Sequence, residues 1–310
     1  MNPIINVQNL SKNFRELNAV DKLSFSVIKG EVYGFLGQNG AGKSTTIRML
    51  LTLIEPSGGL IEMFGHDLKT NRNMILAQVG AIIEKPDLYT YLTALENLRI
   101  MARLSNYKAT TNDLIRHLDI VGIGARKDSK VKTFSQGMKQ RLGIACALIH
   151  NPQLVILDEP TNGLDPQGIA DVRNLILHLS RNEGKTILVS SHLLSEIELI
   201  ADSMLIIDKG KKLAEGKVNE LIDPAHTVVL IQTTDKNAAI EKLSKSKWAN
   251  YLQKSTSEIM LQIHRNEIPE VAKDLVALDI PVLSLQPKNS LEAFFLSLTT
   301  TNQHVAPYKN

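Results

Sequence analysis

One octapeptide limits what this chain can fold into more than any other stretch: residues 37–44 are Gly-Gln-Asn-Gly-Ala-Gly-Lys-Ser. The order matches the phosphate-binding loop (P-loop), in which backbone N–H groups face phosphate oxygens. Such a loop needs a strand before it and a helix after it. Residues 31–36 have the apolar pattern of a short buried strand, and residues 45–51 are predicted to be helical, with the positive end of the helix dipole toward the anion. The sequence therefore predicts a site for a nucleoside triphosphate.

Two side chains of the P-loop have specific roles at such a site. The Lys43 amine can reach the β- and γ-phosphates, and the Ser44 hydroxyl can ligate Mg²⁺. The expected nucleotide-binding residues are Gly37, Gln38, Asn39, Gly40, Ala41, Gly42, Lys43, Ser44 and Thr45.

A second phosphate-associated element lies at residues 154–161, where an apolar run leads directly into the carboxylates of Asp158 and Glu159. A buried strand that ends in aspartate presents a Mg²⁺ ligand at the sheet edge in nucleoside triphosphatases. Asp158 is therefore an expected metal ligand, and Glu159 stands at the position to polarise an attacking water. A strand that simply ends in an acidic turn is the alternative, which the presence of the P-loop disfavours.

The composition is that of an ordinary globular protein, with 43% apolar and 22% charged residues among 310. The net charge of +3 gives no indication of a nucleic-acid partner. Residues 1–6 lack the features of a secretory signal, and no apolar stretch is long enough for a transmembrane helix, so we expect no direct membrane span. The single cysteine, Cys146, excludes an intramolecular disulfide, fits a reducing compartment and is predicted to be a small core residue rather than a reactive thiol.

Short apolar strands alternate with helical stretches from residue 1 to about residue 223, which predicts an α/β sheet with helices packed against it. Residues 88–133 lack a strand signal and are predicted to be a helical insertion. From residue 226 to 299 the pattern is that of a small α+β C-terminal domain, and residues 300–310 are expected to be disordered. The expected strands are residues 4–7, 32–36, 79–83, 154–157, 186–189, 204–207, 227–232, 258–264 and 281–285, and the expected helices are 92–104, 111–121, 237–244, 268–278 and 291–298.

Three further motifs carry a resemblance to a known family. Residues 134–138 are Phe-Ser-Gln-Gly-Met before a predicted helix, residues 162–165 are Asn-Gly-Leu-Asp, and His192 follows a predicted buried strand. With the P-loop and the acidic strand end, in this order, they resemble the ATP-binding subunits of ABC transporters over residues 4 to about 220. The family's signature motif is usually Leu-Ser-Gly-Gly-Gln, of which Ser135 and Gly137 match here.

The resemblance implies roles for these residues. Ser135 and Gly137 would contact the γ-phosphate of ATP held by an opposite subunit, although by themselves they look like an ordinary helix start. Asp165 would belong to a loop that crosses the dimer interface. His192 would contact the γ-phosphate, although a lone histidine after a strand is more often structural.

Phe14 resembles the aromatic residue that stacks on adenine in this family, and Val20 would pack beside it. Core packing of Phe14 is the alternative. The chain departs from the usual pattern at Glu84, which stands where the family has a glutamine, as in the branch of export ATPases that includes bacitracin- and lantibiotic-resistance systems. A carboxylate can ligate Mg²⁺, so Glu84 is an expected metal ligand that couples ATP occupancy to the membrane subunit. A surface glutamate is the alternative.

The resemblance implies a P-loop ATPase whose two copies close head to tail on two ATP–Mg²⁺. Glu159 would be the base toward water, and Lys43, Ser44, Asp158 and His192 would stabilise charge on the transferred phosphoryl. Closure would drive a separate transmembrane permease subunit, which makes the chain peripheral on the cytoplasmic face of the membrane.

Two other functions compete with this interpretation. A soluble ABC-type ATPase that acts on nucleic acid or on the ribosome is disfavoured by the near-neutral charge and by the lack of a second such domain or a long insertion. A regulatory nucleotide-binding protein without turnover is disfavoured because Glu159 and His192 are both present.

Overall fold

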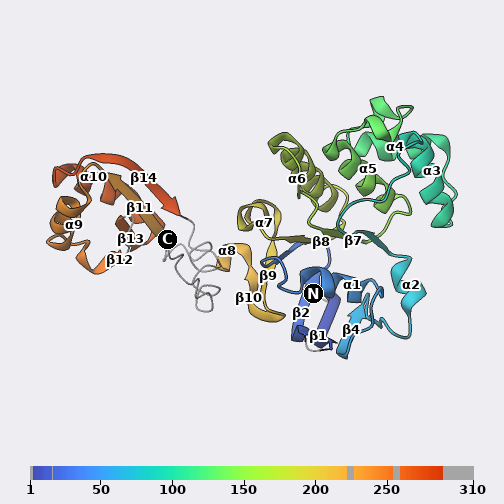
Figure 1. The fold of residues 1–310 in the computed structure, drawn as a ribbon, viewed down its shortest axis with the longest axis horizontal. Coiled ribbons are helices and arrows are strands. Elements are labelled where there is room, and N and C mark those ends of the chain that lie inside the picture. The colour runs from blue at the N-terminus through green and yellow to red at the C-terminus, as the bar shows by residue number, and fades with distance from the viewer. Residues whose placement is uncertain (1–2, 16, 222–226, 254–258, 289–310) are drawn as a thin grey trace, which may run out of the picture. The chain divides into compact units, whose positions relative to one another are not determined.

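The computed structural model of the chain describes residues 3–15, 17–221, 227–253 and 259–288. The chain divides into two compact units, Met1–Val218 and Asn219–Asn310 (Figure 1). Within the described ranges, no helix is long and apolar enough to cross a membrane. The boundary expected near residue 223, the expected helix 291–298 and the expected disordered tail 300–310 lie outside the described residues.

The first unit is built on a six-stranded sheet of order β10-β9-β3-β8-β7-β6. All its strands run parallel except β10, which is antiparallel to β9. β3, β7 and β8 are buried along their whole lengths, which explains why their sequences are largely continuous apolar runs rather than alternating ones. The strands are β3 (Val32–Leu36), β6 (Val79–Ile82), β7 (Leu154–Asp158), β8 (Thr186–Ser191), β9 (Ser203–Asp208) and β10 (Lys211–Lys217).

A second, antiparallel sheet of order β2-β1-β4-β5 completes this unit. The strand expected at residues 4–7 belongs to this sheet and not to the parallel one, because β1 pairs with β2 and β4. Helix α1 (Lys43–Leu50) packs between the sheets: Ile47 and Leu50 share one buried cluster with Phe25 of β2 and Phe35 of β3. The strands are β1 (Pro3–Phe14), β2 (Leu17–Ile28), β4 (Gly58–Met63) and β5 (His66–Asp67).

The expected helical insertion contains α3 (Ala94–Leu104) and α4 (Thr111–Ile120), which Figure 1 places beside α5 at one end of the unit. Thr93 and Thr110 cap these helices, each in a reciprocal pair of hydrogen bonds with the acidic residue at the third helical position, so the helix starts are fixed locally. The other elements are α2 (Arg72–Leu76), η1 (Gly124–Arg126), η2 (Val131–Thr133), α5 (Gln136–Leu148), α6 (Pro166–Arg181), α7 (Leu194–Ile200) and α8 (Val218–Leu221).

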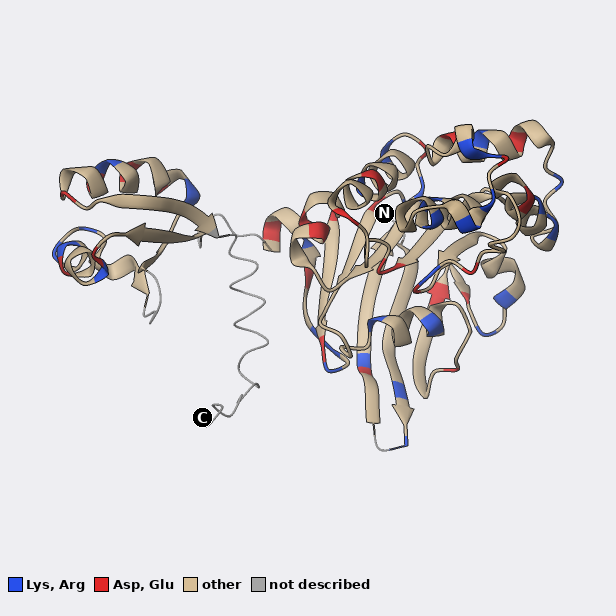
Figure 2. Ribbon diagram, turned by 45° about the horizontal axis from the view of Figure 1, so that its top comes forward, with Lys and Arg blue, Asp and Glu red and all other residues tan. Residues whose placement is uncertain are grey.

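The C-terminal unit has the β-α-β-β-α-β order of ferredoxin-like folds, with an antiparallel sheet of order β12-β13-β11-β14. Val229 and Ile231 of β11 form its core with Leu243 of α9 and Leu275 of α10. Figure 2 shows charged residues of both signs on the helices of this unit and of the first. The elements are β11 (Thr227–Thr233), α9 (Lys236–Ser244), η4 (Ala249–Tyr251), β12 (Leu252–Gln253), β13 (Ile259–Ile263), η5 (Arg265–Glu267), α10 (Ile268–Ala277) and β14 (Val282–Lys288).

Cys146 lies in α5 and is half-buried, so it is somewhat more accessible than the sequence predicts. Burial raises the pKa of its thiol to about 12. The reactive thiolate is therefore scarce near neutral pH, as expected of a structural cysteine.

Gly80 of β6 lies against the backbone of α5, and a Cβ atom placed there would overlap the carbonyl oxygen of Ala147. We expect Gly80→Ala to lower the free energy of unfolding by about 1–3 kcal/mol, because the helix must move away from the sheet. Gly58→Ala is the matched control, since a Cβ there would enter open space. Urea unfolding followed by circular dichroism measures both; equal midpoints for the two variants would contradict the prediction.

Candidate active site

The P-loop connects β3 to α1 at the carboxyl ends of the parallel strands. Gly42 precedes α1 with a φ of 106°, a conformation that glycine adopts at little cost. A Cβ atom at Gly42 would lie 2.6 Å from the carbonyl oxygen of Ala19, and one at Gly37 would lie 2.6 Å from that of Ile207. Neighbouring backbone therefore requires glycine at both positions.

The remaining P-loop residues divide by exposure. Asn39 and Gly40 are exposed and Gln38 is half-buried, so the tip of the loop faces solvent. Ala41 is buried. Ser44 and Thr45 lie in the first turn of α1 and are half-buried. The positive end of the α1 dipole therefore lies beside accessible backbone and hydroxyl groups, as an anion site needs.

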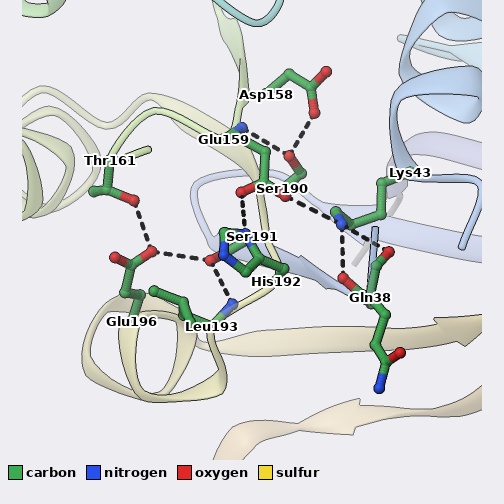
Figure 3. Close-up of polar contacts among 11 residues, drawn as sticks. Gln38, Lys43, Asp158, Glu159, Thr161, Ser190, Ser191, His192, Leu193 and Glu196 are labelled. Atoms are coloured by element: carbon green, nitrogen blue, oxygen red, sulfur yellow. Dashed lines mark hydrogen bonds and ion pairs between the residues drawn. The ribbon is translucent and has the colours of Figure 1, made fainter. Parts of the chain in front are cut away.

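Lys43 is folded onto its own loop. Its Nζ atom donates to the carbonyl oxygens of Gly37 at 2.6 Å and Gln38 at 3.2 Å, and it lies 3.1 Å from Oε1 of Glu159 (Figure 3). The Lys43 side chain is only 5% exposed and that of Glu159 is 16% exposed. A buried ammonium is costly unless it is paired, so the carboxylate of Glu159 stabilises Lys43 in this position.

Asp158 ends β7 and is fully buried. The register of β7 and β8 places Ser190 opposite it, and the Ser190 hydroxyl donates to Oδ1 of Asp158 at 2.6 Å. The same hydroxyl oxygen accepts from the backbone N–H of Glu159 at 2.9 Å. The second carboxylate oxygen of Asp158, Oδ2, is buried and has no hydrogen-bond partner among the described residues. The two carboxylate oxygens of Asp158 thus differ: one is hydrogen-bonded and the other is not.

Glu159 lies directly after the strand with a φ of 50°, the left-handed region that is unfavourable for a side chain of this kind. This conformation turns its carboxylate between two partners. Oε1 faces Lys43, and Oε2 accepts from Nδ1 of His192 at 2.7 Å (Figure 3). The structure therefore brings Lys43, Glu159 and His192 into contact, with Asp158 next to Glu159 at the end of β7.

Ser135, Gly137 and Asp165 form a separate group. Ser135 caps α5 by accepting from the N–H of Met138, and Asp165 caps α6 by accepting from the N–H of Gly168. A Cβ on Gly137 would lie 3.6 Å from the Cα of Gly168, so the two helix starts are neighbours. Ser135 and Asp165 are exposed, and neither hydrogen-bonds to the P-loop or Glu159 within the described part of the chain.

Phe14 is 44% exposed, with the Nζ atom of Lys12 5.0 Å from its ring centroid. Its ring is therefore available at the surface, and the alternative of core packing is not what the structure has. Val20 is fully buried in the core cluster, and its packing beside Phe14 stays a prediction.

Glu84 does not join the other carboxylates. It follows β6 with a φ of 57°, its side chain is 64% exposed, and Oε1 lies 2.5 Å from Nη2 of Arg48 on α1. Among the described residues, no group of three or more histidine, cysteine or acidic side chains is arranged to hold a metal ion. The metal-ligand role of Glu84 stays a prediction.

Ser190 is a residue of the site that sequence reasoning missed. Two serines precede His192 in the sequence, which is the only signal for it. Its link to Asp158 depends on β7 and β8 being neighbours in a particular register, and residues 158 and 190 are far apart in the chain.

The comparisons with known proteins agree with this geometry. A profile of the ABC transporter family matches residues 20–162. The chain is 42% identical over 301 residues to the bacitracin transport ATP-binding protein BcrA of Bacillus licheniformis, covering 96% of this chain and 98% of the relative. It is 41% identical over 212 residues to the lantibiotic transport ATP-binding protein SrtF of Streptococcus pyogenes, covering 68% of this chain and 90% of the relative. A solved structure of an ATP-binding subunit of an ABC transporter is 34% identical, with a TM-score of 0.62, and covers 70% of this chain and 91% of that one.

The fold and the site define a P-loop ATPase. The chain belongs to the ABC transporter ATP-binding proteins. As an ATP-binding subunit of this family it binds and hydrolyses ATP. Subunits of this family dimerise and work with transmembrane permeases. The names of these three relatives mention neither nucleic acid nor the ribosome.

Replacing Ser190 tests the arrangement around Asp158. Ser190→Ala removes the donor to the buried carboxylate and the acceptor of the Glu159 N–H, so we expect the free energy of unfolding to fall by about 1–3 kcal/mol. Ser195→Ala, at an exposed position in α7, is the control and should change it by less than about 0.5 kcal/mol. Urea unfolding measures both, and an unchanged Ser190→Ala variant would contradict the hydrogen-bond assignment.

Proposed function

We propose that this chain is the ATP-hydrolysing subunit of an exporter, and that Glu159 is its general base. The observation that carries the proposal is the Glu159 carboxylate, held between Lys43 of the P-loop and His192 after β8. A base that a second group orients, at the edge of a phosphate-binding loop, is suited to polarise an attacking water.

Lys43 and Glu159 restrain each other before nucleotide enters. The Lys43 amine has two loop carbonyls and one carboxylate as partners. A triphosphate offers stronger acceptors to the amine, so Lys43 turns toward the phosphates and the Glu159 carboxylate is released to accept a proton from water. His192 donates from Nδ1 to Glu159 and keeps the carboxylate aimed while it stabilises charge on the transferred phosphoryl.

The residues around Asp158 fit Mg²⁺. Oδ2 of Asp158 is a buried oxygen without a hydrogen-bond partner among the residues that the structure describes, and the Ser44 hydroxyl stands at the start of α1. Hard oxygen donors of this kind, together with phosphate oxygens, are what Mg²⁺ prefers. Asp158 and Ser44 would hold the ion, which would neutralise charge on the β- and γ-phosphates.

A second copy of the chain would complete the site. Ser135, Gly137 and Asp165 are adjacent, stand at two helix N-termini and, in the part of the chain that the structure describes, have no hydrogen bond to their own P-loop. In a head-to-tail dimer, the start of α5 from one copy would meet the γ-phosphate bound by the other. Phe14, exposed at the end of β1, would stack on the adenine.

The transmembrane permease would dock at a groove of about 390 Å³ in the first unit. It is lined by β6, by Ile83 and residues 85–88 after it, by Met101 of α3 and by α5. Tyr89 and Tyr91 beside it are 40% and 65% exposed, with their rings edge to face. Exposed aromatic side chains of this kind are typical of protein interfaces. The chain would then be peripheral on the cytoplasmic face of the membrane. The names of BcrA and SrtF point to a peptide antibiotic as cargo.

Glu159→Gln should reduce ATP turnover by about 100-fold or more, because a neutral amide cannot accept the proton from water. ATP affinity should rise rather than fall, since the phosphates no longer compete with a carboxylate for the Lys43 amine. Glu183→Gln, a half-exposed glutamate after α6, is the control. Steady-state phosphate release and equilibrium nucleotide binding measure the two quantities. Turnover equal to that of the parent protein would overturn the assignment of the base.

The same variant tests the transport function. Tagged Glu159→Gln protein with ATP–Mg²⁺ is used as bait in gently solubilised membranes, and the captured proteins are identified by mass spectrometry. Stoichiometric capture of a polytopic membrane protein supports the exporter. Capture of ribosomal or DNA-bound proteins alone would replace it with the soluble ATPase.

Glu84→Gln tests the proposed coupling role of this residue. Its exposed ion pair with Arg48 contributes little to stability, so folding and ATP binding should stay intact while permease-coupled hydrolysis changes. Arg48→Gln is the control, because it removes the same ion pair and leaves the carboxylate. Unchanged hydrolysis in Glu84→Gln, or the same change in both variants, would refute a separate role of the carboxylate.

A further inference from the structure

The carboxylate of Glu196 connects two loops, and Glu196 belongs to none of the motifs described above. It lies in the first turn of α7, and its Oε2 atom accepts from the hydroxyl of Thr161 at 2.6 Å and from that of Ser191 at 2.9 Å (Figure 3). Thr161 lies in the segment between Glu159 and α6, whereas Ser191 ends β8. One carboxylate oxygen therefore joins the loop after the proposed base to the loop of His192.

The bond to Ser191 also fixes the backbone around His192. The Ser191 hydroxyl donates to Glu196 and accepts from the N–H of Leu193 at 2.9 Å. The residues on both sides of His192 are thus attached to one hydroxyl, which the carboxylate orients. Free rotation of that hydroxyl would leave the Leu193 N–H without a defined acceptor.

The surroundings strengthen this link. A hollow of about 270 Å³ next to Glu196 is lined mostly by apolar side chains, among them Ile169, Ile176 and Ile197. Hydrogen bonds to a carboxylate are stronger where water is scarce. A carboxylate in the first turn of a helix is also favoured by the helix dipole. The Glu196 side chain is half-buried, and its hydrogen bonds to the hydroxyls of Thr161 and Ser191 fix the position of Oε2.

We infer that Glu196 is a positioning residue that makes the placement of His192 on Glu159 depend on the loop that begins with Thr161 and ends at Asp165. This inference rests on the proposed function, because it assumes that the Glu159–His192 pair carries hydrolysis. A contact that moves Asp165 displaces Thr161, and Glu196 passes the displacement to Ser191 and so to His192. The carboxylate thereby links an exposed loop to the proposed catalytic pair.

The test is a double-mutant cycle on the full chain. Glu196→Leu keeps the side-chain volume and removes the acceptor, and Thr161→Val removes the donor at constant shape. We expect each to lower kcat for ATP by about tenfold, with ATP affinity within about twofold, because misplaced catalytic groups slow chemistry without weakening binding. The double variant should be no slower than the slower single variant, since both changes break one link.

Controls separate this role from general damage. Thr161→Ser keeps the hydroxyl and should restore kcat, and Ser195→Ala, on the same helix, should leave it unchanged. Circular dichroism checks that the variants are folded, and Thr161→Val, with its conserved shape, serves if Glu196→Leu fails to fold.

Three results would overturn the inference: kcat within twofold of the parent in both single variants, additive losses in the double variant, or equal losses of kcat and ATP affinity. Glu159→Gln is measured alongside. If it hydrolyses ATP normally, the proposed function fails. If it is inactive while Glu196→Leu is fully active, only the role of Glu196 fails.

Discussion

The active site depends on one ion pair, between Lys43 of the P-loop and Glu159 at the end of β7. Both side chains are largely removed from water, and neither charge could stay there alone, because an unpaired buried charge destabilises a fold by several kcal/mol, roughly 3–5. The pair therefore holds the P-loop lysine and the carboxylate in defined positions. Under the proposed function, nucleotide binding would exchange these contacts for phosphate contacts, so that substrate entry and release of Glu159 would be one event.

The order of strands makes this pair possible. β3 and β7 flank β8, all three are parallel, and their carboxyl ends lie at the same edge of the sheet. The P-loop, Asp158 and His192 follow these three ends, so groups far apart in the chain meet within hydrogen-bond distance. β8 supplies both Ser190, which holds Asp158, and the backbone oxygen of Ser191, which accepts from the Gly37 N–H at 3.3 Å. The middle strand thus connects the acidic strand end to the P-loop.

What the sequence could predict follows from how local each signal is. The P-loop, the strand before Asp158 and the capped helices of the insertion are defined by neighbouring residues, and the structure has them within one or two residues of the predicted bounds. The antiparallel sheet was not predicted, because its strands pair across the chain and β1 by itself looks like a further strand of the parallel sheet. Ser190 and Glu196 were missed for the same reason: their partners are set by strand register and loop geometry. Glu84 was expected beside the metal ligands, but a neighbouring arginine on α1 offers it a partner that no spacing rule indicates.

The separation of Ser135, Gly137 and Asp165 from the P-loop has a physical consequence for regulation. A single chain already holds Glu159, the proposed base, in contact with Lys43 and His192. Under the proposed function, the exposed helix starts of a second copy would supply further donors to the γ-phosphate. Efficient hydrolysis would then require two chains, and a loop that senses the second chain must report to the histidine within the first. Thr161, Glu196 and Ser191 form one hydrogen-bonded route between those two places in the described structure, which is why we assign a positioning role to this carboxylate outside every recognised motif.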